Sequence, residues 1–180
     1  MACEINAGYV LGCRDNTGGI RNIYILSGSI SGVTLDANDE GLITDIAGDG
    51  VWYTYQIVKG TGNFTETTNT SIENGTTVYE QVVEAPFHKM QSVLRNQIRV
   101  LAKNSAIKVV VETQNGTVDG IGRYFLIGQF NGATLTGGTG TTGTALSDMN
   151  AYTLQFTGME PEPAREIDDF PNALTGQTID

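Results

Sequence analysis

A glycine-rich tract matches a spacing that can bind a dinucleotide. Gly138, Gly140 and Gly143 fit the pattern G-x-G-x-x-G, in which glycines let the backbone approach a pyrophosphate at the start of a helix. That chemistry requires a helix directly after the glycines. Here a segment with alternating apolar residues begins at Tyr152, which is typical of a strand. We therefore expect a flexible loop at this tract and no cofactor.

The acidic residues 36–41 resemble the start of a calcium-binding loop. Their sequence, Asp-Ala-Asn-Asp-Glu-Gly, has side-chain oxygens at alternate positions and glycine at the sixth. The twelfth position, which supplies a bidentate glutamate in such loops, is Ala47. The pattern indicates an acidic turn, and we expect no metal site.

Neither the histidine nor the cysteines are placed for catalysis. His88 is the single histidine, and no nucleophile or orienting carboxylate can be assigned beside it, so we expect a surface residue at the start of a helix. Cys3 and Cys13 lack the further ligands of a structural zinc site. A disulfide between them is possible in principle. Because the first residues show no signal-peptide pattern, we expect two thiols, in a protein used in a cytoplasm or in particles assembled there. We expect no enzyme.

Alternation of apolar and polar residues predicts that most of the chain forms strands. The predicted strands cover about residues 20–26, 33–35, 42–46, 51–58, 76–84, 107–111, 120–130 and 152–156. One helix is predicted over 88–103, where apolar residues recur at spacings of three and four: Met90, Val93, Leu94, Ile98 and Leu101. The fold class predicted is mainly β, a β-sandwich or half-barrel with one flanking α-helix. No run of about 20 apolar residues exists, so we expect no membrane partner.

Two segments have too few apolar residues to form a core of their own. Residues 63–71 are nearly all Thr, Asn, Ser and Glu, and Glu73-Asn74-Gly75 supplies a hairpin turn. Residues 59–84 are therefore predicted to form an arm that projects toward a neighbouring subunit, or else a mobile surface hairpin. After Pro163 the chain is acidic and poor in apolar residues. We divide it into a single domain, 1–162, and an extended acidic tail, 163–180, that a partner orders.

Charge is segregated along the sequence. The net charge is −10, which argues against tight binding of nucleic acid, because binding requires neutralisation of phosphates. Residues 36–50 contain five acidic residues and no basic one, whereas residues 88–108 contain five basic residues and no acidic one. The opposed blocks either pair between copies of the chain or are solvated faces.

The last predicted strand resembles that of a known family. The run Ala145-Leu-Ser-Asp-Met-Asn-Ala-Tyr-Thr-Leu-Gln-Phe-Thr-Gly158, followed by Glu160-Pro161, is similar to the C-terminal strand of tail tube (major tail) proteins of tailed bacteriophages, particularly those of Bacteroidetes-type hosts. The resemblance implies a β-sandwich flanked by a helix, which assembles into hexameric rings stacked as a hollow tube. Such a tube conducts genomic DNA without binding it specifically.

The resemblance implies a location in the virion, in the phage tail, assembled in the cytoplasm of the bacterial host. The implied partners are other copies of the chain and other tail proteins. The resemblance, together with the polar arm, the basic helix and the acidic tail, suggests which residues contact neighbouring subunits. These are Phe64, Glu66, Glu73, Asn74, Glu80, Arg95, Arg99, Glu160 and Glu162. The alternatives are another virion protein of the same fold (a tail terminator, a connector ring or a capsid decoration protein) and a non-viral β-sandwich binding module.

Overall fold

A computed structural model describes residues 8–9, 16–115 and 123–180. Cys3, Cys13 and part of the strand predicted over 120–130 lie outside the described residues. The chain is mainly β, with 56% of residues in strands and 6% in one helix. The elements are β1 Ile20–Leu35, β2 Leu42–Gln56, β3 Asn63–Ser71, β4 Thr76–His88, α1 Ser92–Leu101, β5 Val109–Thr113, β6 Tyr124–Ile127, β7 Ala133–Thr141, β8 Ala151–Glu160, β9 Arg165–Ile167, β10 Leu174–Thr175 and β11 Thr178–Ile179.

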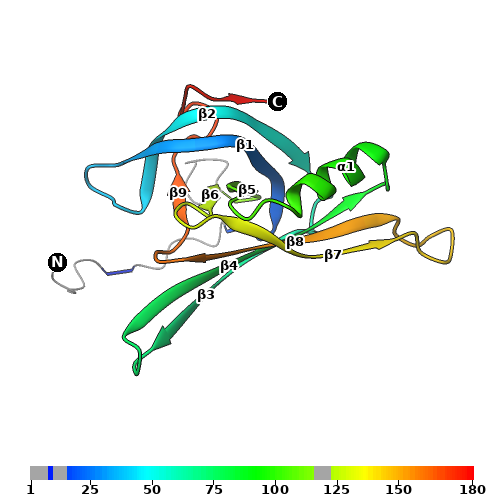
Figure 1. Ribbon diagram of the computed structural model, residues 1–180, viewed down its shortest axis with the longest axis horizontal. Coiled ribbons are helices and arrows are strands. Elements are labelled where there is room, and N and C mark those ends of the chain that lie inside the picture. The colour runs from blue at the N-terminus through cyan, green and yellow to red at the C-terminus, as the bar shows by residue number, and fades with distance from the viewer. Residues whose placement is uncertain (1–7, 10–15, 116–122) are drawn as a thin grey trace.

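Five strands close into a barrel. They follow the order β1-β5-β6-β9-β2, and β2 pairs again with β1. The short strands β10 and β11 add to β2 in parallel. Figure 1 shows β1 and β2 as the long strands that arch over one side of this unit.

A second sheet of four strands lies against the barrel. Its order is β3-β4-β8-β7, and every neighbouring pair is antiparallel. In Figure 1 this sheet runs the length of the molecule, with the β3–β4 hairpin projecting at one end and the β7–β8 loop at the other. The helix α1 lies on the same side of the sheet as the barrel.

Alternate residues of the barrel strands enter two separate cores, which explains their nearly continuous apolar character. In β1, Ile23 and Ile25 pack toward the second sheet, in contact with Val83, Phe156 and α1. Tyr24 and Leu26 point the other way, into the barrel. The strand predicted over 20–26 is therefore covered on both sides.

The long strands β1 and β2 merge segments that were predicted as separate short strands. Gly28 and Gly50 face each other across this hairpin, both with positive φ, at 154° and 108°. A Cβ on Gly28 would lie 2.1 Å from the Asp49 carbonyl oxygen, so only glycine permits this approach. The pairing therefore continues through Ser27-Gly28-Ser29, where the apolar alternation stops.

The C-terminal residues belong to the folded domain, and the expectation of an extended tail after residue 162 was wrong. Strand β9 pairs with β2 and β6, and Phe170 is fully buried in the barrel. The Phe170 ring lies 5.1 Å from Trp52 and 4.9 Å from Tyr24, measured between centroids. The Trp52 Nε1–H donates to the Gln177 side chain at 2.5 Å. One buried aromatic ring therefore outweighs the acidic composition around it.

The helix is shorter than the predicted 88–103. His88 is the last residue of β4, not a helix start, and Lys89 adopts a positive φ of 67° before α1 begins at Ser92. Leu101 is buried, and Leu94 and Ile98 pack against the core beside it. Val93, which the spacing placed on the apolar stripe, is 66% exposed.

The glycine tract forms a strand, so the prediction of a flexible loop was wrong. Residues 137–141 of β7 pair in register with β8, with Gly138 opposite Leu154 and Gly140 opposite Tyr152. A Cβ on Gly140 would lie 2.7 Å from the Tyr152 ring. Glycine here leaves room for a cross-strand side chain.

Candidate subunit interface

One face of the four-stranded sheet packs on the core, and most of the described residues on the other, open face are exposed or half-buried. Phe64, Val83 and Phe156 are register partners on the packed face. Because successive residues of a strand point to opposite faces, their neighbours lie on the other side. This open face comprises Thr65, Thr67, Glu80, Val82, Glu84, Thr134, Thr139, Thr153, Gln155 and Thr157.

The open face has no lysine or arginine, and its one histidine is His88 at the end of β4. None of the ten lysines and arginines of the chain falls within β3, β4, β7 or β8. Its charged members are Glu80 and Glu84, and the remainder are mainly hydroxyl and amide side chains. A Thr136–Thr157 hydroxyl contact of 2.7 Å links β7 to β8. The surface is polar and weakly acidic.

Both outer strands of this sheet have a free side. Among the described residues, β3 pairs only with β4, and β7 pairs only with β8 apart from a single bridge from Ala133 to Ile107. Backbone donors and acceptors along 134–141 and 63–71 thus lie at sheet edges, which are ready to pair with another strand. Because three antiparallel pairings separate them, β3 and β7 run in opposite directions.

The β3–β4 hairpin extends past its own sheet. The pairing of β4 with β8 ends at Tyr79 opposite Glu160, while β3 and β4 continue to pair as far as Ser71 and Thr76. Residues 69–78 therefore form an arm supported only by each other, and Figure 1 shows it projecting from the molecule. At the tip, Ile72 is 94% exposed. The projecting part is shorter than the predicted arm of residues 59–84, because 63–68 and 79–84 pair within the sheet.

Several predicted contact residues lie at this surface. Glu73 and Asn74 are exposed at the arm tip, and the Asn74 N–H donates to the Ser71 hydroxyl at 3.3 Å. Glu80 is half-buried on the open face. Arg95 and Arg99 are exposed on α1 and form no ion pair with the described residues. Their roles as subunit contacts stay predictions.

Other predicted contact residues are engaged within the subunit. Phe64 is half-buried, with its ring 6.0 Å from that of Phe125. Glu66 accepts hydrogen bonds from the Ala164 N–H at 2.6 Å and from Gln81 at 3.3 Å. Glu162 forms an ion pair with Arg165. These three side chains tie the start of the arm and the C-terminal segment to the domain.

Glu160 is not placed for contact with a second subunit. Its side chain is buried, with a relative exposure of 1%. The carboxylate accepts the backbone N–H groups of Phe130 at 2.8 Å, Asn131 at 3.0 Å and Gly132 at 3.1 Å. It therefore anchors the turn between β6 and β7, because buried N–H groups need acceptors.

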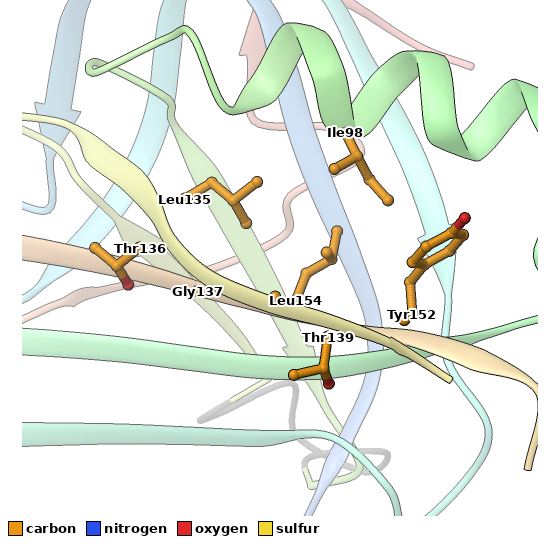
Figure 2. Close-up of a pocket in the computed structure, with 9 residues that line it drawn as sticks. Ile98, Leu135, Thr136, Gly137, Thr139, Tyr152 and Leu154 are labelled. Carbon is orange, nitrogen blue, oxygen red and sulfur yellow. The ribbon is translucent and has the colours of Figure 1, made fainter. Parts of the chain in front are cut away.

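A shallow groove separates β7 from α1. It measures about 350 Å³ and is lined by Ile98, Leu135, Tyr152, Leu154 and the β7 glycines. Figure 2 shows the Tyr152 side chain rising between β7 and α1. The Tyr152 hydroxyl is buried and has no hydrogen-bond partner within the described chain. The groove lacks a charged or catalytic group.

A buried carboxylate that the sequence did not single out lies at one end of the barrel. Glu112 accepts hydrogen bonds from Arg123 at 2.8 Å, Asn22 at 2.7 Å and the Tyr24 hydroxyl at 2.9 Å. Burial by itself would raise the pKa of Glu112, but these hydrogen bonds outweigh burial and hold its pKa below the ordinary value. Both oxygens are occupied by donors, so the group joins strands and is not positioned as a general base.

The described residues contain neither a cluster of metal ligands nor a helix that could span a membrane. No group of three or more His, Cys, Asp or Glu is placed there to hold a metal ion. In the turn at 36–41, the Asp36 and Asp39 carboxylates accept the N–H groups of Asn38 and Gly41, both at 2.8 Å. No helix among the described residues has the length and apolar character needed to cross a membrane.

The open face, its two free edges and the arm are therefore the features that an interaction would use. Comparison of the chain with models of protein families, with curated proteins and with solved structures finds no match.

Proposed function

We propose that this chain is a structural virion protein that assembles into stacked, hexameric rings and forms the tail tube of a bacteriophage. The observation that carries the proposal is the four-stranded sheet, which within the described residues has two free edges and an exposed face without lysine or arginine. The sequence resemblance to tail tube proteins supplies the identity of the assembly.

The free edges supply the means of ring closure. In a ring whose axis follows the strands, β7 of one copy meets β3 of the next. Because these strands run in opposite directions within a subunit, their meeting continues the antiparallel order. Such a heterologous contact closes into a ring when the rotation between copies is right. Closure also removes the exposed edges, which are aggregation hazards in an isolated subunit.

The open face suits the lumen of a DNA conduit. A channel that lets DNA slide must offer few positive charges, because each neutralised phosphate adds affinity. Glu80 and Glu84 would repel phosphates, and the Thr-rich remainder offers neutral hydroxyls. In this arrangement genomic DNA passes without specific binding, and the protein acts without a cofactor or catalysis.

The finer architecture supports the same proposal. The packed face of the sheet is covered by the barrel and α1, and we infer that this layering corresponds to a tail-tube-like β-sandwich with one helix. The helix α1, which contains Arg95 and Arg99, lies on that side of the sheet. The outer surface then presents Arg95 and Arg99 to acidic residues of another copy, such as those of 36–50.

Proline substitution in β7 tests the edge pairing. Adjacent N–H groups of a strand point to opposite sides. Of Gly138→Pro and Thr139→Pro, one therefore removes a donor to β8 and the other removes a donor at the free edge. We expect the variant that keeps the wild-type unfolding midpoint to remain monomeric by light scattering where the wild type assembles. Thr142→Pro, just beyond the strand, is the matched control and should assemble.

Assembly that survives both substitutions would exclude β7 as the contact strand. Discrete rings that never stack would instead favour a terminator or connector ring. A wild-type protein that stays monomeric at high concentration would favour a decoration protein or a non-viral binding module.

A further inference from the structure

Two Asn-Gly dipeptides lie wholly within the described residues and differ sharply in environment. In such a dipeptide the glycine nitrogen can attack the side-chain carbonyl carbon of asparagine, because glycine has no Cβ to hinder it. A nitrogen–Cγ bond forms, the Cγ–Nδ2 bond breaks, and ammonia leaves with a proton from the attacking N–H. Water then opens the cyclic imide to aspartate or isoaspartate. The reaction needs no oxidant and no reactant besides water.

At Asn74-Gly75 nothing opposes this reaction. Both residues are exposed at the arm tip, and a Cβ built on Gly75 meets no heavy atom within 4 Å. The Asn74 backbone N–H donates to Ser71, but neither the Asn74 side-chain amide nor the Gly75 N–H has a hydrogen-bond partner among the described residues. Among the described residues, the strands next to the tip pair only with each other, which leaves its backbone less restrained than the rest of the sheet.

At Asn131-Gly132 the same two groups are occupied. The Asn131 side-chain amide donates to the Met159 carbonyl at 2.6 Å. The attacking nitrogen, that of Gly132, is buried and donates to the Glu160 carboxylate at 3.1 Å. Loss of the proton from this nitrogen is disfavoured beside a negative charge. Close packing also restricts the backbone, since a Cβ on Gly132 would lie 2.5 Å from the Ala106 Cα.

We propose that Asn74 is a site of spontaneous deamidation in the native protein, and that Asn131 is protected by the fold. The product places a new carboxylate beside Glu73 at the arm tip. The isoaspartate form also adds a methylene group to the backbone of the turn. Both changes alter the charge and shape of a segment that projects beyond the sheet. The inference depends on the arm geometry and not on the proposed tube.

Peptide mass mapping after incubation of the purified full chain in mildly alkaline buffer tests the proposal. In native buffer we expect Asn74 to gain the deamidation mass shift at least roughly tenfold faster than Asn131, a barrier difference of about 1.4 kcal/mol. In denaturant the two sites should react at similar rates, because the protection of Asn131 belongs to the fold.

Variants separate the chemistry from the general mobility of the tip. Asn74→Gln should abolish the shift in the arm peptide, and Gly75→Ala should slow it, because a Cβ hinders the attacking nitrogen. Ser71→Ala, which changes the same turn without touching the reacting groups, should leave the shift in place. Equal rates at Asn74 and Asn131 in native buffer, or a faster reaction at Asn131, would overturn the proposal.

Discussion

At the scale of single residues, Glu112 connects three strands at one end of the barrel. It lies on β5, its hydrogen-bond donors Asn22 and Tyr24 lie on β1, and Arg123 directly precedes β6. The side chain is 3% exposed and the Arg123 side chain 33%. The Glu112 carboxylate is paired with Arg123 and accepts hydrogen bonds on both oxygens, so its ionised form stabilises the fold.

This arrangement predicts a pH dependence of stability. Because the pKa of Glu112 is lowered in the folded state, its contribution is fully present above the unfolded pKa of about 4.3. The contribution is lost as pH falls through the folded pKa. Glu112→Gln should lower the free energy of unfolding at neutral pH by about 1.5–3 kcal/mol.

Urea unfolding between neutral and acidic pH measures this effect. The difference between wild type and Glu112→Gln should shrink on acidification. Glu84→Gln, the same change on the open face, should cost less than about 0.5 kcal/mol at every pH. A constant difference for Glu112→Gln would show that the carboxylate charge does not matter.

Glu160 shows how far residue roles could be predicted from the sequence. The alternation that starts at Tyr152 continues through Leu154 and Phe156, and the same parity places Glu160 on the packed face. The alternation therefore indicates a buried position for Glu160, but a charged residue next to a proline is more typical of the protein surface. Its hydrogen-bond donors are backbone N–H groups that lie 28–30 residues earlier in the chain. Local sequence does not reveal such long-range satisfaction of a buried charge.

At the scale of elements, strands with regular alternation were predictable and the closure of the barrel was not. β8, β5 and the centre of β1 carry clear patterns. The short strands β9, β10 and β11 have two or three residues each and form by pairing with β2, and β9 also pairs with β6. β7 lacks apolar residues after Leu135 and takes its conformation from β8. Tertiary context therefore overrides weak local preference in these elements.

The C-terminal segment gives an element-scale prediction. Phe170→Ala should lower the free energy of unfolding by about 3–5 kcal/mol, because it opens a cavity among the aromatic rings of the barrel. Thermal and urea unfolding measure the loss. Asp168→Ala, two residues earlier and exposed, should change stability by less than about 0.5 kcal/mol. An unchanged free energy of unfolding in Phe170→Ala would mean that residues 163–180 contribute little to the fold, as expected of an extended tail.

The arm gives a second element-scale prediction. Replacing residues 69–78 by a two-residue turn removes only strand pairs that the rest of the sheet does not support. We expect the shortened chain to unfold at the wild-type midpoint as a monomer and to lose the ability to form tubes. Light scattering and unfolding curves provide the two readouts. Normal tubes from the shortened chain would place the arm at a solvent-facing surface.

At the scale of the whole molecule, charge is sorted between surfaces. The four strands of the second sheet contain Glu66, Glu80, Glu84 and Glu160 and no lysine or arginine, and His88 is the last residue of β4. The basic residues of 88–108 lie on and around α1. A molecule of net charge −10 thus keeps its positive charge away from the open face. Within the tube arrangement that we propose, this separates the surface near DNA from surfaces that meet other copies.

Introducing a positive charge tests this separation. Thr157→Lys places an ammonium at the centre of the open face, on β8. Assembled Thr157→Lys should bind short duplex DNA, with an affinity that falls steeply as salt rises, whereas the wild type should not. Val93→Lys, at an exposed position of α1, is the matched control with the same charge change. Equal DNA binding by the two variants would mean that the open face does not line the channel.

Negative-stain electron microscopy of the purified wild-type chain at increasing concentration tests the proposed assembly most directly. Because β3 and β7 each leave a free edge, we expect copies to join edge to edge and to produce rings that stack into hollow tubes. Fields of separate monomers at every concentration, with the fold intact by circular dichroism, would contradict a tube-forming role.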